Sequence, residues 1–181
     1  MRLKKLFLLS LLAGTLPIAG FAASRFSTVG TPAQFEESAE PTGELRKVVR
    51  VVDGDTIVVS PNEKVRLIGV DTPETVHPKK AVACFGKEAT RFTRDAVEGK
   101  SVRLVLDKVN TKRRHKDRYG RTLAYAYLAD GKMLNAELIR QGYAHAYTRF
   151  PFRYLVEFRE LERQARTQTV GLWSSCSLNE Q

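Results

Sequence analysis

The chain reads VVRVVDGDTIVVS from Val48 to Ser60, so that two runs of β-branched residues flank an Asp-Gly step. β-Branched residues are favoured in strands, and Asp-Gly is favoured in the tight turns that join the strands of a hairpin. We therefore predict two adjacent strands over residues 48–52 and 56–60.

Further elements extend outward from this hairpin. A third strand is predicted over residues 64–70, before Pro73, which cannot donate to the ladder of a sheet. Strand patterns also occur over residues 101–106 and 122–128, and helix patterns over residues 86–98, 133–141 and 152–168. Five short strands with three helices are typical of a small α+β domain built on a curled antiparallel sheet.

Composition narrows the class of protein. The 181 residues are 43% hydrophobic, which excludes a disordered or collagen-like chain and suffices for one domain. Of the formal charge of +10, residues 1–23 contribute +3 and residues 24–43 contribute −2, which leaves +9 on residues 44–181. Such an excess suggests a polyanionic partner, nucleic acid or an anionic membrane surface, and the alternative is an ordinary soluble basic surface.

The N-terminal residues have the three-part pattern of a secretory signal peptide. Basic residues precede an apolar run from Leu6 to Ala19, and a stretch of mostly small residues follows. We predict a signal peptide over residues 1–23, and an uncleaved membrane anchor is the alternative. The predicted organisation continues with a flexible linker over 24–43, a domain over 44–175 and a C-terminal tail over 176–181.

Export would expose Cys84 and Cys176 to an oxidising compartment, where free thiols rarely persist. We predict that they form a disulfide in a secreted or periplasmic protein, and two unpaired thiols are the alternative. After cleavage of the leader we expect a monomer with no stable membrane association.

Three acidic residues and one arginine lie near the predicted hairpin and the end of the third predicted strand. The hairpin can bring Asp55 beside Asp71 at the end of the third strand, with Arg66 and Glu74 close by. Two neighbouring carboxylates repel unless a proton or a cation bridges them, and hard oxygen ligands favour Ca²⁺ or Mg²⁺. A single Asp in a turn could instead cap its own backbone.

Other catalytic motifs are excluded by their spacing. An EF-hand that begins at Asp53 would have Val58 in place of its glycine and Lys64 in place of its glutamate. The chain contains no His-Glu-x-x-His pair and no Gly-x-Ser-x-Gly elbow. Each of its three histidines is therefore expected to be a surface residue.

Three segments identify a family. The sequences VDGDT (52–56), RLIGVDTPET (66–75) and DRYGR (117–121) resemble the thermonuclease family, of the staphylococcal nuclease type, and the resemblance covers about residues 46–174. It implies an OB-type five-stranded barrel with three helices. It also implies Ca²⁺-dependent hydrolysis of phosphodiesters in DNA and RNA, with products that carry a 3′-phosphate.

The resemblance also assigns metal ligands and a base. It implies that Ca²⁺ is held by the side chains of Asp55 and Asp71 and by the backbone carbonyl of Thr72, with Glu74 as the proposed general base. A carboxylate beside the attacking water accelerates hydrolysis typically by about 10² to 10⁴. Glu74 could instead serve mainly to anchor that water.

The resemblance also implies which residues bind the substrate. Arg66 and Arg121 match two phosphate-binding arginines, and guanidinium groups give the paired hydrogen bonds that suit phosphate. Arg118 and Tyr119 match positions beside the terminal phosphate of a bound nucleotide. Tyr147 matches a tyrosine that stacks on a base, although this segment aligns only with a gap, and simple packing is its alternative role.

One loop departs from the family pattern. The loop of residues 109–116 is longer than the corresponding loop of the type member, and residues 107–121 carry a net charge of +5. We expect this loop to grip the phosphate backbone without reading sequence, and a solvated loop is the alternative. The whole chain is then predicted to be an exported, Ca²⁺-dependent nuclease with little sequence preference. The alternatives are a noncatalytic nucleic-acid-binding OB module and, less favoured, an envelope-attached protein that contacts anionic lipid.

Overall fold

The structure is a computed structural model that describes residues 42–75 and 82–177. The predicted signal peptide and all but two residues of the predicted linker lie outside the described residues, as do His77 and most of the predicted tail. In the described part of the chain no helix has the length and apolar character needed to cross a membrane.

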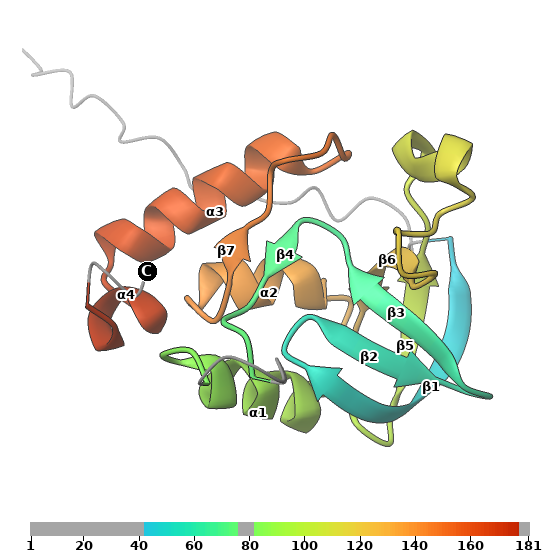
Figure 1. Cartoon of the computed structure of the whole chain (residues 1–181), viewed down its shortest axis with the longest axis horizontal. Helices are drawn as coiled ribbons and strands as arrows, with labels where there is room; N and C mark the ends of the chain where they lie inside the picture. Colours follow the sequence, from blue (N-terminus) through green and yellow to red (C-terminus); the bar gives the residue numbers. More distant parts are fainter. Residues whose placement is uncertain (1–41, 76–81, 178–181) are drawn as a thin grey trace, which may run out of the picture. The chain divides into compact units, whose positions relative to one another are not determined.

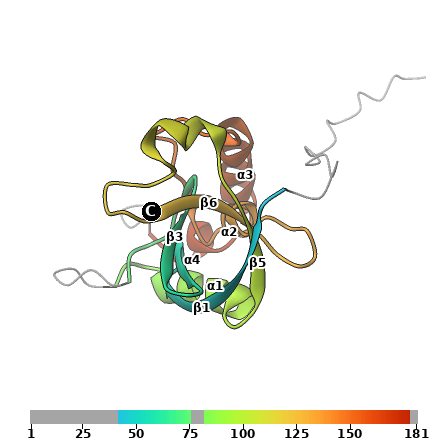
Figure 2. The ribbon, with the colours of Figure 1, turned by 90° about the vertical axis from the view of Figure 1, so that its right-hand side faces the viewer.

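Five strands close into a barrel in the order β1-β2-β3-β6-β5 (Figures 1 and 2). Their bounds are β1 Glu44–Asp53, β2 Thr56–Val59, β3 Glu63–Leu67, β5 Ser101–Val105 and β6 Thr122–Tyr127. This confirms the predicted α+β class and the five-stranded OB-type barrel.

The strand directions differ from the prediction in one place. Neighbouring strands are antiparallel except β3 and β6, which pair in parallel with Arg66 opposite Leu123. The chain travels through a helix and β5 before it returns beside β3, so it enters β6 in the same direction as β3. The barrel is therefore mixed, and the expectation of a wholly antiparallel barrel was wrong.

The third predicted strand is interrupted before its end. β3 stops at Leu67, and the chain turns at Gly69, whose φ is 73°. A Cβ at Gly69 would lie 2.6 Å from the ring of Phe152, so the turn needs glycine here. Beyond the turn, β4 (Val70–Asp71) leaves the barrel and pairs with β7 (His145–Ala146).

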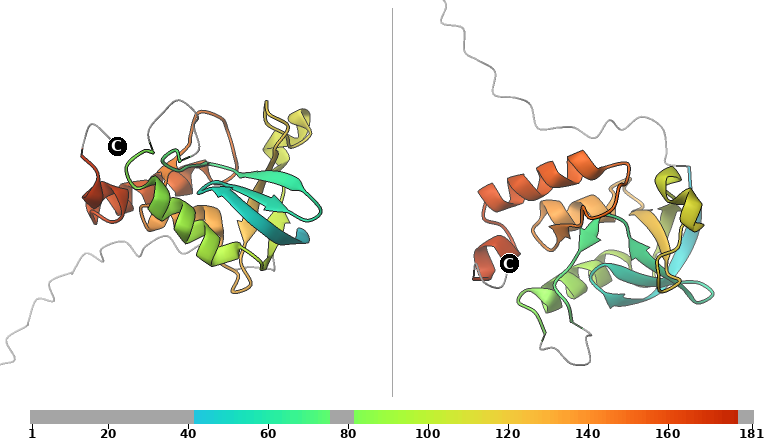
Figure 3. Two further views of the ribbon diagram at one scale, coloured as in Figure 1. Left: turned by 60° about the horizontal axis from the view of Figure 1, so that its bottom comes forward. Right: turned by 45° about the horizontal axis from the view of Figure 1, so that its top comes forward.

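The three predicted helices are present with shorter bounds. They are α1 (Gly86–Val97), α2 (Leu134–Arg140) and α3 (Leu155–Thr167), and they gather on one side of the barrel with α2 between α1 and α3 (Figure 1). Two short helical elements were not predicted, the helix α4 (Leu172–Ser175) and the 3₁₀ helix η1 (Lys108–Arg113) in the basic loop. Figure 3 shows η1 at the barrel end, remote from α4.

The core fills the barrel and the space beneath the helices. Its fully buried side chains include Ile57, Leu67, Tyr125, Leu138 and Phe158. Buried Asn135 joins α2 to the barrel, since its amide donates to the Ile68 carbonyl at 2.9 Å and accepts from Ala126 N at 2.9 Å. The barrel therefore forms a rigid support for the loops at its rim.

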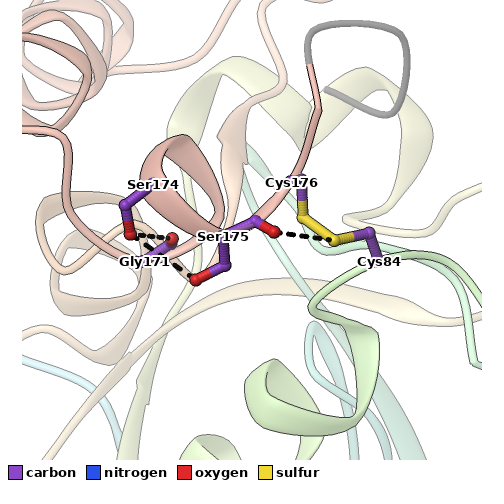
Figure 4. The surroundings of a disulfide bond; sticks show 5 residues. All are labelled: Cys84, Gly171, Ser174, Ser175 and Cys176. Carbon is purple, nitrogen blue, oxygen red and sulfur yellow. Dashed lines mark hydrogen bonds between the residues drawn. A yellow bond between two sulfur atoms is a disulfide. The ribbon is translucent and has the colours of Figure 1, made fainter.

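Cys84 and Cys176 form a disulfide in the structure, with their Cα atoms 5.9 Å apart (Figure 4). The bond joins the segment before α1 to the end of α4, across 92 residues of chain. In the chain-entropy account, closing a loop of this length stabilises a fold by about 4 to 5 kcal/mol. Beside it, Leu172 and Trp173 pack in a small second apolar cluster.

Candidate active site

An open cleft of about 930 Å³ lies at the rim of the barrel. Its walls come from the β1–β2 turn, β3, the segment after β4 and the loop before β6. The predicted site residues that line it are Asp55, Arg66, Asp71, Thr72, Glu74, Arg118, Tyr119 and Arg121. The structure thus brings together all of the predicted metal, base and phosphate positions, and Tyr147 is outside the cleft wall.

Arg66 is the centre of the cleft. Its Nη2 lies 3.0 Å from Asp55 Oδ2 and 3.2 Å from Asp71 Oδ1. Its Nη1 donates to the backbone carbonyls of Val70 at 2.5 Å and Leu67 at 3.1 Å. The two carboxylates therefore meet at one guanidinium group, which the turn after β3 holds in a fixed orientation.

The β1–β2 turn places Asp55 deep in the cleft. Asp55 is 7% exposed, and it accepts hydrogen bonds from Thr56 Oγ1 at 2.8 Å and Thr72 N at 3.2 Å. A Cβ at Gly54 would lie 2.7 Å from the Thr72 side chain, so glycine allows this close approach of the turn to the segment after β4. The Asp-Gly-Asp turn thus fixes a carboxylate beside the other acidic segment.

Asp53 stabilises the same turn through hydrogen bonds to neighbouring segments. It is buried, and its Oδ1 accepts hydrogen bonds from Gly54 N at 2.8 Å, Thr75 Oγ1 at 2.8 Å and Thr90 Oγ1 at 3.0 Å. These contacts connect the hairpin to the segment after β4 and to α1. Sequence reasoning gave Asp53 no role in the site, because its partners come from distant parts of the chain.

Arg121 lines the cleft from the loop before β6. Its Nε lies 2.6 Å from Asp117 Oδ2, and its Nη1 donates to Thr56 Oγ1 at 3.4 Å. Asp117 Oδ1 also accepts from the backbone N of Tyr119 at 2.8 Å and of Arg121 at 2.9 Å. Asp117 therefore fixes both the turn and the guanidinium, a positioning role that the sequence motif alone did not assign.

Tyr119 projects from this turn with 66% of its surface exposed. The guanidinium carbon of Arg118 lies 4.7 Å from the centre of its ring, and that of Arg121 lies 5.2 Å away. An exposed ring flanked by two cations offers a flat apolar face next to positive charge, which suits a nucleotide.

Glu74 lines the cleft from the segment after β4, where its side chain is exposed. Its backbone carbonyl accepts a hydrogen bond from Ala83 N at 2.9 Å. It lies close enough to Asp71 for its charge to act on that carboxyl. An exposed carboxylate at the mouth of the cleft is accessible to the water that a hydrolase must activate.

The carboxylates of the cleft are crowded. Burial by surrounding atoms raises the pKa of Asp71 above its usual range, and the charges of Asp55 and Glu74 act in the same direction, against Arg66 and His145. About half of the Asp71 side chain is still accessible to solvent. The folded protein therefore stabilises the ionised form of Asp71 less well than water does.

The donors of the cleft fit a hard cation. Asp55 and Asp71 supply carboxylate oxygens, and buried Thr72 Oγ1 has no hydrogen-bond partner in the described part of the chain. Oxygen ligands of this kind bind Ca²⁺ or Mg²⁺. Residues 42–75 and 82–177 contain no group of three Asp, Glu, His or Cys side chains arranged as metal ligands, so further ligands would be backbone carbonyl, water and substrate.

His145 is a residue of the cleft that the sequence analysis treated as an ordinary surface histidine. It lines the cleft, and on β7 it pairs with Asp71 of β4. Its Nδ1 lies 3.6 Å from Glu162 Oε1, and its ring meets Trp173 edge-on with centres 5.0 Å apart. No local sequence signal shows this position, because the pairing of β4 with β7 joins segments far apart in the chain.

Tyr147 lies just beyond β7, where its backbone N donates to the Gly69 carbonyl at 2.9 Å. Its ring centre is 6.1 Å from that of Phe150. Tyr147 is two residues from His145 of the cleft wall but is not part of that wall, and its role in stacking on a base stays a prediction.

Comparisons with known proteins agree with this geometry. The profile of the family described as "Staphylococcal nuclease homologue" matches residues 64–175. The "Thermonuclease" of Staphylococcus hyicus is 39% identical over 155 residues, which cover 83% of this chain and 88% of that protein. The "Thermonuclease" of Staphylococcus intermedius is 41% identical over 144 residues, 76% of this chain and 81% of the relative. "Endonuclease YncB" of Bacillus subtilis is 38% identical over 130 residues, 69% of this chain and 59% of the relative.

Proposed function

The chain belongs to the family of staphylococcal nuclease homologues and is a nuclease that hydrolyses nucleic acid, and we propose that it cuts both DNA and RNA in a Ca²⁺-dependent reaction with little sequence preference and leaves 3′-phosphate ends. One observation carries the proposal. Asp55 and Asp71 meet at Arg66, with Arg121 joined to the same group through Thr56.

Asp55, Asp71 and the Thr72 carbonyl are the residues that would hold Ca²⁺. When bound, the ion would neutralise phosphate charge and polarise the scissile phosphodiester as a Lewis acid. The crowded, partly compensated carboxylates around Asp71 support this assignment, because a hard cation would relieve their repulsion.

The two arginines would orient the substrate. Arg66 and Arg121 both line the cleft with planar guanidinium groups, and each is held by at least one carboxylate. Groups fixed before the reaction stabilise the charge that develops on the phosphate oxygens at little cost in reorganisation. Arginine suits this role better than lysine because its N–H groups form paired, directed hydrogen bonds.

Glu74 would accept the proton of the attacking water. The new bond forms between the water oxygen and phosphorus, and the bond from phosphorus to the 5′-oxygen breaks. The proton of the water passes to the Glu74 carboxylate, and the leaving 5′-oxygen takes a proton from solvent. This direction of attack leaves the phosphate on the 3′ side. The noncatalytic alternative is set aside because relatives of this chain are named thermonuclease and endonuclease.

We further propose that the protein is exported and acts as a monomer in a secreted or periplasmic setting. The leader pattern of residues 1–23 supports export, and the Cys84–Cys176 disulfide is typical of an oxidising compartment. Fractionation of expressing cells, with the N-terminus of the mature protein determined by mass spectrometry, tests this proposal.

Digestion of single- and double-stranded DNA and RNA, with Ca²⁺ or with a chelator, tests the reaction. We expect Ca²⁺-dependent cutting of all four substrates, with 3′ ends from which a phosphatase releases phosphate. Glu74→Gln should lower kcat by about 10² to 10⁴. The matched control is Glu88→Gln on the exposed face of α1, which should cut at the wild-type rate. Cutting in the presence of chelator, or a full rate in Glu74→Gln, would contradict the mechanism.

A further inference from the structure

A second cationic surface lies beyond the cleft. It is formed by the basic arm, residues 108–116, and by the β7–α3 loop, residues 147–154. Both segments lie along the upper edge of the domain in Figure 1. Together they carry seven Lys and Arg residues and no Asp or Glu. Such a concentration of one sign of charge attracts a polyanion.

A buried carboxylate holds the arm and the loop together. Asp107 is 4% exposed and accepts hydrogen bonds from Val109 N at 2.9 Å, Tyr125 Oη at 2.6 Å and Arg153 N at 2.8 Å. It therefore caps η1, contacts the barrel core and fixes the start of α3 at once. Burial, together with the hydrogen bond to Asp107, keeps the pKa of Tyr125 well above its usual range, so the hydroxyl remains a donor.

The other end of the arm is also attached to the barrel. Leu123 N donates to the His115 carbonyl at 2.7 Å, and Lys116 forms a β-bridge with Thr122. The Lys116 ammonium group lies 3.2 Å from Glu63 Oε1. The arm is thus held at both ends in a defined position, which lowers the entropic cost of binding.

Most cations of the arm have no acidic partner. Lys108, Lys112 and Arg114 are exposed, and within residues 42–75 and 82–177 no carboxylate forms an ion pair with them. By contrast, Arg66 and Arg121 in the cleft contact carboxylates at 3.0 Å and 2.6 Å. Exposed cations without a partner are available to phosphate groups, which release counterions when they bind.

An exposed aromatic ring connects the arm to the cleft. Phe150 is 50% exposed, and the guanidinium carbon of Arg113 lies 5.2 Å from the centre of its ring. The ring centre of Tyr147 lies 6.1 Å from that of Phe150, and Tyr147 follows His145 of the cleft wall by two residues. The aromatic pair therefore contacts the arm through Arg113 and belongs to the chain segment that continues from His145 in the cleft wall.

We propose that the basic arm and Phe150 form a second binding site for the single strand whose scissile phosphate lies in the cleft. The cations of the arm contact the phosphates of nucleotides several positions away, and Phe150 stacks on one of their bases. Contacts to phosphate and to the face of a base do not read sequence, so the site raises affinity for long strands of any composition. The inference rests on the proposed function, because it assigns the partner of the same cleft.

Two substrates separate the arm from the cleft. One is a dinucleotide, which fills only the cleft, and the other is a single strand of about 16 nucleotides, near the upper range of OB-fold site sizes. The arm variant combines Lys112→Gln, Arg113→Gln and Arg114→Gln. A matched control combines Lys47→Gln, Arg50→Gln and Arg91→Gln, which removes the same charge from exposed positions on β1 and α1.

We expect the arm variant to lower kcat/KM for the long strand by about tenfold at low salt, and the slope of log kcat/KM against log salt to fall by about 2. Cutting of the dinucleotide should be unchanged. In the control variant, the difference in kcat/KM between the long strand and the dinucleotide should equal that of the wild-type protein. An unchanged salt slope in the arm variant, or an equal loss on both substrates, would overturn the proposal.

Phe150→Leu tests the stacking contact, because leucine keeps an apolar side chain without an aromatic face. We expect a loss of about fivefold or more on the long single strand and none on the dinucleotide. A wild-type rate on the long strand would remove Phe150 from the site. If the wild-type protein cuts neither substrate, the proposed function fails; if it cuts both and the arm variant matches it, only this inference fails.

Discussion

The molecule holds its cationic side chains in two contrasting ways. In the cleft, Arg66 and Arg121 contact carboxylates and have defined orientations. In the basic arm, Lys112 and Arg114 are exposed and form no ion pair in the described part of the chain. Chemistry at a phosphate needs groups fixed to within a fraction of an ångström, whereas attraction of a polyanion needs only charge near the path of the strand. We therefore expect the same substitution to have very different effects in the two regions.

The largest contrast is expected from Arg→Lys changes. Arg66→Lys keeps the charge but cannot reproduce the paired contacts of the guanidinium, so we expect kcat to fall by about 10² to 10³. Arg114→Lys keeps the charge in the arm, where charge is what matters, and its rate on a long strand should change by less than about twofold. Rate measurements on one long substrate compare the two variants directly, and equal losses would erase the distinction between cleft and arm.

A smaller effect is expected where only the support of an arginine is removed. Asp117→Asn weakens the contact to Arg121 Nε and leaves the guanidinium in the cleft. We expect kcat to fall by about tenfold, since a displaced group still carries its charge. Asp130→Asn is the control, because Asp130 forms an exposed pair with Lys132. A wild-type rate in Asp117→Asn would show that Arg121 needs no fixed orientation and acts only through its charge, as we expect for the cations of the arm.

The contrast between the two regions also separates what the sequence predicts from what it does not. The Asp-Gly-Asp hairpin has a strong local pattern, so Asp55 and its approach to Asp71 follow from the sequence. Strands and helices were located to within a few residues for the same reason. The family motif likewise identifies Arg66 and Arg121 as candidates, and the structure brings them to one cleft.

Contacts between segments far apart in the chain could not be predicted from local sequence patterns. The parallel pairing of β3 with β6, the place of His145 beside Asp71 and the three contacts of Asp107 join segments far apart in the chain. The break at Gly69 was missed because the strand pattern continues through it, and only packing against Phe152 shows why the chain must turn.

The smallest predicted effect concerns stability and the crowding of the cleft. The pKa of Asp71 is raised in the folded protein, so the folded state binds this proton more tightly than the unfolded chain does. The contribution of Asp71 to stability is then greatest below the ordinary Asp pKa of 3.8, and it falls as the pH rises through the pKa of the folded state. At neutral pH the ionised Asp71 therefore costs stability unless a cation is bound.

Asp71→Asn should accordingly raise Tm in the presence of chelator at pH 7, by roughly 2 °C, while it abolishes cutting in Ca²⁺. Near pH 3 the two proteins should melt at similar temperatures, because Asp71 is then protonated. Asp95→Asn, at an exposed position on α1, is the control and should leave Tm nearly unchanged at both pH values. A lower Tm for Asp71→Asn in chelator would mean that attraction to Arg66 outweighs crowding. In that case Arg66 alone would balance the charge of the cleft carboxylates without a bound cation. Cleft and arm would then differ in where their charged groups lie, and not in whether those charges are balanced.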